Sequence, residues 1–574
     1  MPAHNADIAA IFDEIADLLE LQQQNPFRIR AYRRAAQVAR SQGRELADQL
    51  AAGRDLTALP GIGDDLAAKI AEIAATGRCR TLDALRKEVP PGLEELLHLP
   101  GLGPARVRQL RRELRITGPA QLKAAIESGR LRELRGFGPK LEARLGEALA
   151  NPVTGHRMLR ATAAEYARSL VSHLERVPGV KRVAVAGSFR RGRDTVGDLD
   201  LLVESDSGGP VVAALTGYEN IREVLAAGAT RASIRLASGL QVDLRVVDKS
   251  SFGAALHYFT GSKAHNLRLR RLAQRRGLKV NEYGVFRGAR RIAGETEESV
   301  YASLGLPWIA PELREDSGEF EAARQDALPR LVTREDLRGD LHAHTAATDG
   351  SASIEDMARA ARRAGLEYLA IADHSRYLGA HRGLDADRLA RQVEDIEALA
   401  GRIPGLTLLK AIEVDILEDG SLALPDEVLR QLDLVVGAVH SHFDLSERKQ
   451  TARLLRALER PHFSVLAHPT ARLIGERPPL NLDLERVIRG CAERGCFIEL
   501  NSQPQRLDLD EAGCRLAAQH GVLVSITSDA HGCEDFALLD GGITQARRGW
   551  LEAGAVLNAQ PLKELRLLLQ RTMH

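Results

Sequence analysis

Seven short apolar segments recur at nearly regular intervals in the C-terminal part of the chain, and they constrain its fold more than any other feature. The ends of successive segments lie 27 to 39 residues apart, which is the length of one strand and one helix. Helical patterns such as 354–364 and 386–399 fill most of the intervals. Because parallel strands joined by helices close into a barrel, we predict a seven-stranded (β/α) barrel over residues 337–574. The segments are Asp340–His342, Tyr368–His374, Leu406–Glu413, Leu434–His440, Ser464–His468, Phe497–Leu500 and Leu523–Asp529.

Nine side chains that can bind metals lie at or near the ends of these segments. A single histidine at a strand end is more often a packed core residue, but nine such residues at the C-terminal ends of barrel strands indicate a metal site. Mixed imidazole and carboxylate ligands suit Zn²⁺, Mn²⁺ or Fe²⁺, and we expect two or three ions. His442 lies further out and is either a substrate contact or structural. The nine residues are His342, His344, Asp349, His374, Glu413, His440, His468, Asp529 and His531.

Residues 1–150 contain a pattern, repeated three times, in which one apolar residue separates two glycines. The copies are Leu59-Pro-Gly-Ile-Gly63, Leu99-Pro-Gly-Leu-Gly103 and Leu134-Arg-Gly-Phe-Gly138. Glycine permits a tight turn with positive φ, and the helix that follows presents unpaired N–H groups to a phosphate. The pattern resembles the helix-hairpin-helix motif, which binds the DNA backbone without reading sequence. An ordinary turn between two helices is the alternative for a single copy. We predict DNA contacts at Gly61, Gly63, Gly101, Gly103, Gly136 and Gly138.

Charge is distributed unevenly along the chain. Residues 1–318 hold 48 Lys and Arg against 38 Asp and Glu, whereas residues 319–574 hold 31 against 40. A basic first half favours a polyanionic partner such as DNA.

No apolar run is long enough to span a membrane. The segment Met1–Leu19 has four acidic and no basic residues, which argues against a secretory or mitochondrial leader. The five scattered cysteines indicate reduced thiols in the cytoplasm.

Three aspartates in the middle of the chain are spaced for two-metal chemistry. Asp198 and Asp200 alternate on one predicted strand, so both side chains point to the same face. Asp243 lies on the second strand of a predicted hairpin over residues 233–247. Three carboxylates on adjacent strands supply the oxygen ligands that two Mg²⁺ ions require. Surface acids on a sheet edge are the alternative for any one of them, but together with the turn at Gly187 they predict nucleotidyl transfer.

Four motifs around these aspartates resemble the family X DNA polymerases: Gly187-Ser-Phe-Arg-Arg-Gly192, Gly197-Asp-Leu-Asp200, Val242-Asp-Leu244 and Tyr258-Phe-Thr-Gly-Ser262. The resemblance implies that Asp198 and Asp200 bridge two Mg²⁺ or Mn²⁺ ions and that Asp243 binds the catalytic one. It also implies a dNTP site with Gly187, Ser188, Arg191 and Gly197 at the triphosphate, Tyr258, Phe259 and Gly261 at the sugar, and Asn266 and Arg270 at the nascent base pair. The chain departs from the family at Lys263 and Leu267, near the template.

The N-terminal residues resemble the lyase domain of the same family. Tyr32 matches, and Lys69 occupies the position of the Schiff-base lysine. Asp65 stands where the family has a lysine that binds a 5′-phosphate. The resemblance implies either deoxyribose-phosphate lyase activity, with Lys69 as the nucleophile, or 5′-phosphate docking without it. An ordinary solvated helix lysine is the remaining interpretation of Lys69.

The barrel ligands resemble those of the PHP (polymerase and histidinol phosphatase) family. The resemblance implies three ion positions. His342, His344, Glu413 and Asp529 would form the first; Glu413, His440 and His468 the second; Asp349, His374 and His531 the third.

Together these features predict a multidomain α/β protein. The expected parts are a lyase-like helical domain (1–90), helix-hairpin-helix repeats (91–150), a nucleotidyltransferase palm with a mixed sheet (151–260), a nascent-base-pair subdomain (261–317), an acidic linker (318–336) and the PHP barrel (337–574). We expect a monomeric bacterial polymerase that uses gapped or primer–template DNA and dNTPs in base excision repair. It would act in the cytoplasm at the nucleoid, without a membrane.

The barrel is expected to act as a 3′–5′ exonuclease, or to cut at abasic sites. Two rival functions remain at this point. One is a polymerase whose barrel hydrolyses small phosphoesters. The other is a DNA-binding scaffold without activity, and the complete set of ligands argues against it.

Overall fold

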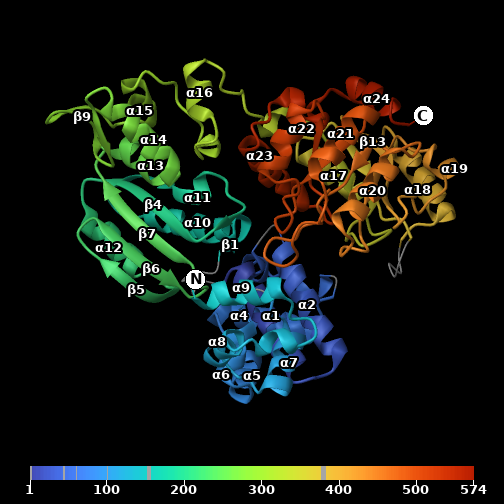
Figure 1. Cartoon of the computed structure of the whole chain (residues 1–574), viewed down its shortest axis with the longest axis horizontal. Helices are drawn as coiled ribbons and strands as arrows, with labels where there is room; N and C mark the ends of the chain where they lie inside the picture. The colour runs from blue at the N-terminus through green and yellow to red at the C-terminus, as the bar shows by residue number, and fades with distance from the viewer. Residues whose placement is uncertain are drawn as a thin grey trace. The chain divides into compact units, whose positions relative to one another are not determined.

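The computed structural model describes residues 3–573 except 43–44, 60, 98, 100, 151–156 and 377–382. The chain divides into two compact units (Figure 1). The first comprises Met1–His156 with residues 218–222 and 235–240, and the second comprises the remainder. None of the helices in the described residues has the length and apolar character that a membrane span requires. All five cysteine thiols are free.

The described residues between positions 3 and 150 are mostly helical, as predicted (Figure 1, blue to cyan). Local sequence sets several of the boundaries. Asn25 caps the second helix by accepting a hydrogen bond from the backbone N–H of Phe27, and Gly77 ends the fourth in the left-handed conformation. The helices are α1 (Asn5–Leu21), α2 (Pro26–Ser41), α3 (Leu46–Ala51), α4 (Asp64–Thr76), α5 (Arg80–Glu88), α6 (Pro91–Leu97), α7 (Pro104–Leu114), α8 (Pro119–Glu127) and α9 (Pro139–Ala150).

The three glycine turns precede α4, α7 and α9, and the two glycines of each turn have different conformations. The first glycine of each has a φ near +90°: +88° at Gly61, +88° at Gly101 and +90° at Gly136. Gly63 and Gly103, by contrast, are extended N-cap residues with φ of −94° and −88°. The apolar residues between the glycines, Ile62, Leu102 and Phe137, are buried. Positive φ is therefore a requirement of the first glycine and not of Gly63 or Gly103.

The palm, most of which belongs to the second unit, is built on a mixed sheet, as predicted, and the sheet has five strands. Its strand order is β2-β4-β7-β6-β5, with β4 and β7 parallel and β2 antiparallel to β4. The strands are β2 (Val180–Val185), β4 (Asp198–Ser205), β5 (Ile221–Ala227), β6 (Arg231–Leu236) and β7 (Gln241–Val247). Two further short strands, β1 (Met158–Leu159) and β3 (Thr195–Val196), pair with each other. Helices α10 (Arg160–Glu175), α11 (Gly187–Arg190) and α12 (Gly208–Thr216) complete the palm.

The next subdomain combines helices α13 (Phe252–Thr260), α14 (Lys263–Gln274) and α15 (Glu297–Ser303) with a small antiparallel sheet of β8 (Lys279–Asn281), β9 (Gly284–Arg287) and β10 (Arg290–Ala293). The acidic segment expected as a linker contains helix α16 (Glu319–Arg324). Phe320 and Ala323 of α16 are buried in the core of this subdomain, and the Glu319 carboxylate lies 2.7 Å from Nδ1 of the buried His265. The segment therefore packs against the subdomain instead of extending freely between domains.

The C-terminal part is a nearly closed parallel barrel with strands in chain order from β11 to β17, as predicted. A bridge between Ala343 and Ala530 joins the first strand to the segment that follows the last. The strands are β11 (Gly339–Ala343), β12 (Tyr368–Ile371), β13 (Thr407–Asp415), β14 (Leu434–Ala438), β15 (Val465–Leu466), β16 (Phe497–Asn501) and β17 (Val524–Thr527). All residues of β11, β12 and β14 to β17 are buried, which is why the strands read as unbroken apolar runs.

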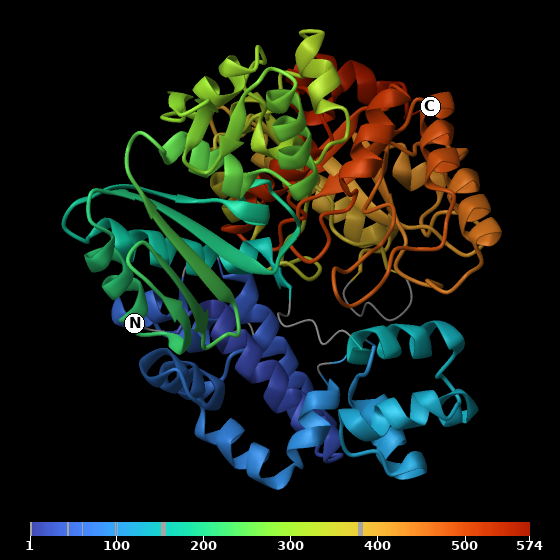
Figure 2. The same cartoon turned by 60° about the vertical axis from the view of Figure 1, so that its left-hand side comes forward.

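Helices surround these strands in both views (Figure 1 and Figure 2). They are α17 (Ile354–Arg363), α18 (Ala386–Leu399), α19 (Asp426–Leu429), α20 (Glu447–Leu458), α21 (Leu484–Arg494), α22 (Glu511–Gln519), α23 (Leu539–Arg548) and α24 (Leu562–Gln570). Several strands end earlier than the sequence pattern suggested. His374, His440 and His468 follow the last strand residue by two or three positions, so they lie in the loops at the barrel mouth.

Candidate active sites

The three palm aspartates lie on one face of the sheet. Asp200 is the register partner of Asp243 across the parallel pair β4 and β7, and Asp198 is two residues before Asp200. The intervening leucine, Leu199, and the neighbours of Asp243 are buried on the opposite face. Gln241 donates a hydrogen bond of 2.9 Å from Nε2 to Oδ2 of Asp243. The structure thus brings the three predicted carboxylates together.

Their electrostatics are those of a cation site. Burial, and then the negative charges of Asp198 and Asp243, raise the pKa of Asp200 to about 7. Burial and the charge of Asp243 also raise the pKa of Asp198. Carboxylates that repel one another in this way gain most from a divalent cation, so their arrangement fits the predicted ions.

Gly187, the first residue of α11, lies close to this cluster. Gly187 has a φ of +63°, and a Cβ added to it would lie 2.2 Å from Oδ2 of Asp200. Ser188 follows in the same short helix, and Gly197 immediately precedes β4. Arg191 comes directly after α11. Its Nη1 donates a hydrogen bond to the Thr260 carbonyl at 2.7 Å, and its Nε donates to Oε1 of Glu315 at 3.1 Å.

The residues expected at the sugar and base pair gather between α13 and α14. Asn266 donates from Nδ2 to the Tyr258 carbonyl at 2.6 Å, and the guanidinium of Arg270 lies 5.0 Å from the centre of the Tyr258 ring. The Phe259 ring packs edge-on against Tyr258, with centroids 5.1 Å apart. A Cβ at Gly261 would lie 2.7 Å from Oδ1 of Asn266, so a larger residue here would displace the Asn266 side chain.

The nine barrel residues form one continuous cluster at the mouth. Three groups each have ligand atoms within 4.8 Å of one another: His342, His344 and Asp529; His374, Glu413 and His440; and His344, Asp349, His374 and His531. Nε2 of His468 lies 2.9 Å from Oε1 of Glu413, which joins it to the second group. Two residues, His344 and His374, therefore belong to two groups each. The sequence resemblance also implies three ion positions with a shared ligand, but there the shared residue is Glu413.

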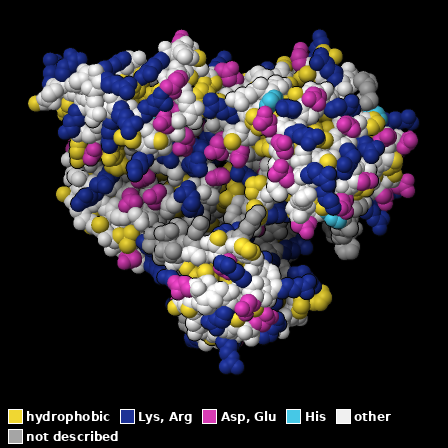
Figure 3. Space-filling view, viewed as in Figure 1, with side chains coloured by type: hydrophobic (Ala, Val, Ile, Leu, Met, Phe, Trp, Pro, Cys, Tyr) yellow, Lys and Arg dark blue, Asp and Glu magenta, His cyan; other side chains and the backbone are white. Residues whose placement is uncertain are grey.

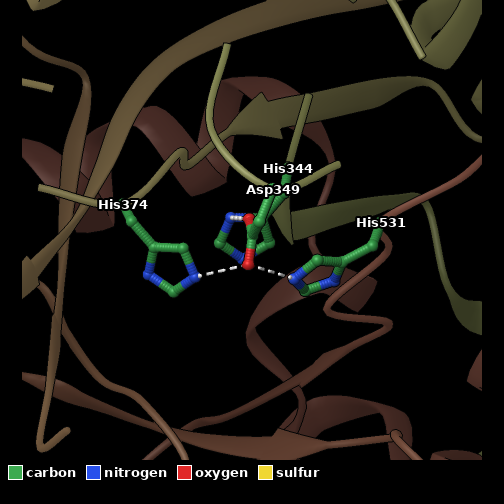
Figure 4. A group of neighbouring side chains, drawn as sticks. All are labelled: His344, Asp349, His374 and His531. Atoms are coloured by element: carbon green, nitrogen blue, oxygen red, sulfur yellow. Dashed lines mark ion pairs between the residues drawn. The ribbon is translucent and has the colours of Figure 1, made fainter. Parts of the chain in front are cut away.

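The third group shows how closely these side chains approach one another. Nε2 of His374 and Nε2 of His531 each lie 3.3 Å from the same carboxylate oxygen of Asp349. Figure 4 shows the two rings approaching that oxygen from opposite sides, with His344 behind it. One oxygen and several imidazole nitrogens pointing to a common position is the arrangement that a metal ion requires.

Two observations show that the cluster fits cations. Nε2 of His342 and Nε2 of His344 face each other at 3.1 Å, although both rings are buried. Burial opposes protonation, yet the charge of Glu413 raises the pKa of His374 to about 11 and that of His440 to about 9. Conversely, the protonated histidines outweigh burial and hold the pKa of Glu413 well below its usual value. The buried carboxylates thus need positive charge, which divalent ions supply in place of protons.

Sequence reasoning missed the acidic residues that hold the ligands in place. The Glu499 carboxylate is fully buried, and its Oε1 lies 2.6 Å from Nδ1 of His342. Oδ1 of Asp415 lies 3.0 Å from Nδ1 of His440. Such carboxylate–histidine pairs orient a metal-binding imidazole. The signal for Asp415 was its position two residues after Glu413 on one strand. Glu499 had a weaker signal, since it lies inside an apolar segment that ends on leucine.

The lyase-like features lie on α4 and near it. Lys69 is half-buried and forms an i,i+4 ion pair with Asp65, which is exposed. A lysine that forms a Schiff base needs a free amine, and the Asp65 carboxylate occupies the amine of Lys69. Tyr32 is buried. His442 is exposed, with Nδ1 3.9 Å from Glu418.

Surface charge alone does not mark a DNA path. On the face drawn in Figure 3, lysine and arginine side chains are interspersed with aspartate and glutamate. The hairpin turns are therefore better evidence for DNA binding than net charge.

The sequence matches four family models. They are a helix-hairpin-helix domain over residues 3–79, a SAM-like helix-hairpin-helix tandem over 93–151, a DNA polymerase beta thumb over 255–315 and a PHP domain over 340–503. The thumb match covers Tyr258 to Arg270 and the PHP match covers most barrel ligands, so both fall on the candidate sites.

Three similar proteins cover different parts of the chain. The DNA polymerase/3′-5′ exonuclease PolX of Bacillus subtilis is 38% identical over 99% of this chain and 100% of its own length. DNA polymerase lambda of Rattus norvegicus is 30% identical over 46% of this chain and 48% of its own. A probable phosphatase of Caldanaerobacter subterraneus is 31% identical over 36% of this chain and 80% of its own.

Proposed function

Because the chain belongs to the bacterial family X DNA polymerases that carry a PHP domain, we propose that its two clusters perform two different reactions. The protein is a DNA polymerase with metal-dependent 3′–5′ exonuclease activity, and it binds DNA and dNTPs. The proposal assigns nucleotide addition to Asp198, Asp200 and Asp243, and phosphodiester hydrolysis to the barrel cluster. The observation that carries it is the register of Asp200 against Asp243, which puts three carboxylates on one face.

In the palm, Asp198 and Asp200 would hold both ions, and Asp243 would hold the one nearest the primer. Divalent ions bound there, Mg²⁺ or Mn²⁺, would supply charge neutralisation for an in-line attack on the α-phosphate. Asp243 would accept the proton of the primer 3′-hydroxyl. Ser188, Arg191 and the glycines Gly187 and Gly197 would bind the triphosphate.

At the other end of the nucleotide, Tyr258, Phe259 and Gly261 would pack against the sugar. Asn266 and Arg270, which already contact Tyr258, would lie against the nascent pair.

In the barrel, the nine ligands would hold two or three ions of Zn²⁺, Mn²⁺ or Fe²⁺, which would polarise a phosphodiester and activate water. Glu413 lies between the histidines of two groups, and Glu499 and Asp415 keep two of those imidazoles in place. We assign this site to 3′-end trimming and to cleavage beside abasic sites. A small-molecule phosphoesterase is less well supported, because the aligned relative over 99% of the chain is named as an exonuclease.

The first unit would dock the 5′ side of a gap. The hairpin glycines would bind the DNA backbone, and Lys69 would bind a 5′-phosphate. Its ion pair with Asp65 supports docking over lyase chemistry. We propose that the protein fills short gaps in base excision repair as a monomer, at the nucleoid in the bacterial cytoplasm.

A single gel experiment tests this assignment. A gapped duplex with a labelled primer is incubated with Mg²⁺ or Mn²⁺, with and without dNTPs. Extension with dNTPs and shortening without them are expected from the wild-type protein. Excess unlabelled duplex should inhibit cleavage of a model phosphodiester if the barrel acts on DNA, and no inhibition would favour the small-molecule alternative.

A further inference from the structure

The turn that carries Arg191 is bound by a helix of the barrel. Arg191 and Gly192 follow α11 of the palm, and α23 of the barrel lies against them within the second unit. Gly192 has a φ of +71°, and a Cβ added to it would lie 2.3 Å from Cγ2 of Thr544. The palm backbone thus approaches α23 as closely as a glycine allows.

Arg548, at the end of α23, makes the central contact. Its side chain is 2% exposed. Nη1 donates to the Arg191 carbonyl at 2.9 Å and to Oε1 of Glu315 at 3.2 Å, and Nη2 donates to Oε1 of Glu511 at 2.8 Å. Arg193, on the same turn, also donates to Oε1 of Glu511 at 3.1 Å. A barrel side chain therefore holds the backbone of a turn in the polymerase half.

Glu315 is shared between two arginines. Its Oε1 accepts from Nε of Arg191 and from Nη1 of Arg548. If Arg191 binds a triphosphate through Nε, it releases Glu315. Glu315 would then be left half-buried and unpaired, which is costly unless a second cation is in place. Arg548 is positioned to keep Glu315 paired when Arg191 moves.

We propose that Arg548 is a positioning residue of the polymerase site: it fixes the Arg191 turn and takes over Glu315 when Arg191 engages the triphosphate of a dNTP. The inference rests on the triphosphate role of Arg191 in the proposed function. It gives the barrel a part in nucleotide addition besides its own chemistry. Loss of Arg548 would leave Glu315 paired with Arg191 alone and remove the donor from the Arg191 carbonyl.

The test is single-nucleotide gap filling with Arg548→Gln across a range of dNTP concentrations. We expect the KM for dNTP to rise about tenfold, equivalent to about 1.4 kcal/mol, with a smaller change in kcat. Exonuclease activity without dNTPs should stay at the wild-type level, because Arg548 contacts none of the barrel ligands in the described structure. That activity also reports that the barrel has folded.

Two further variants separate positioning from a general loosening of the contact. Arg547→Gln is the matched control: Arg547 is the neighbouring residue on α23 and donates to Glu312 and to the Val332 carbonyl, away from the Arg191 turn. Its KM should equal that of the wild type. Adding Glu315→Gln to Arg548→Gln removes the charge that retains Arg191, so the double variant should recover part of the lost dNTP affinity.

The outcomes are decisive in either direction. A folded Arg548→Gln protein with the wild-type KM would overturn the inference, and so would an equal rise in KM for Arg547→Gln. If Arg548→Gln does not fold, Arg548→Lys replaces it. A single lysine ammonium cannot reach both the Arg191 carbonyl and Glu511. The KM for dNTP should therefore rise a few-fold in Arg548→Lys, and an unchanged KM in that variant would overturn the inference. Failure of the wild-type protein to extend a primer would instead refute the proposed function.

Discussion

Glu499→Gln should weaken metal binding in the barrel without touching a ligand. In the wild-type protein, Oε1 of Glu499 accepts from Thr527 at 2.6 Å and lies 2.6 Å from Nδ1 of His342. Oε2 accepts from the backbone N–H of His468 and from Asn501. A glutamine keeps only one of these two oxygens. Whichever way its amide points, an NH₂ group faces donors, and the imidazole of His342 loses an anionic partner.

The size of the effect follows from burial. A hydrogen bond to a charged group is worth about 1.5–3 kcal/mol, and Glu499 has no exposed surface to recover it from water. Replacement of a carboxylate that orients a metal ligand costs about 10- to 100-fold in metal affinity, which is about 1.4–2.7 kcal/mol. The two figures agree, so we expect a loss of metal affinity in that range.

The assay is Mn²⁺ titration by calorimetry, together with exonuclease rate as a function of Mn²⁺ concentration. The Mn²⁺ concentration for half-maximal rate should rise while the rate at saturation recovers, because the ligands themselves remain. Glu485→Gln, an exposed side chain on α21, is the control. Unchanged metal affinity in a folded Glu499→Gln protein would refute the reasoning.

Four other predictions follow from the same contacts. Gly61→Val should reduce the preference for gapped DNA with a 5′-phosphate over plain primer–template in a binding titration, because φ is +88° at Gly61. Gly63→Ala should have a smaller effect, because φ is −94° at Gly63. Equal losses in the two variants would contradict this. Binding of that DNA should also weaken steeply with salt, and a flat salt response would exclude phosphate contacts as its main source. Lys69→Ala should weaken binding of a 5′-phosphate. If Lys69 were instead a lyase nucleophile, borohydride would trap a covalent DNA adduct in the wild-type protein and none in the variant. The pKa of His440 is raised to about 9, so its protonated form stabilises the metal-free protein. That stabilisation is complete below pH 6.5 and is lost as the pH rises through 9. The melting temperature gained on adding metal should therefore grow from pH 7 to about pH 9, and a constant gain would contradict this prediction.

The barrel could be predicted from sequence because its strands are buried on both faces and therefore read as apolar runs. Its ligands could be predicted because they lie at or near the ends of such runs. Asp198, Asp200 and Asp243 were also within reach, since alternation along a strand determines the face to which each side chain points. These features depend on local sequence and on one rule of sheet geometry.

Other features depend on contacts between distant residues. Helix α16 lies in an acidic segment with few apolar residues, and only packing of Phe320 against the preceding subdomain reveals its role. Glu499 looked like part of an apolar strand until His342, 157 residues earlier, was found beside it. Arg548 contacts Arg191 across 357 residues, a pairing that no pattern in a single sequence records.

Separate inactivation of the two sites tests the central claim most directly. Asp243→Asn and His344→Ala proteins are assayed on the same gapped substrate for dNTP addition and for 3′-end shortening, with circular dichroism to confirm folding. Asp243→Asn should lose about 4 kcal/mol or more of transition-state stabilisation, so polymerisation falls by several orders of magnitude while shortening persists. His344→Ala should lose shortening and retain dNTP addition. Loss of both activities in either folded variant would contradict two separate sites and indicate a single shared one.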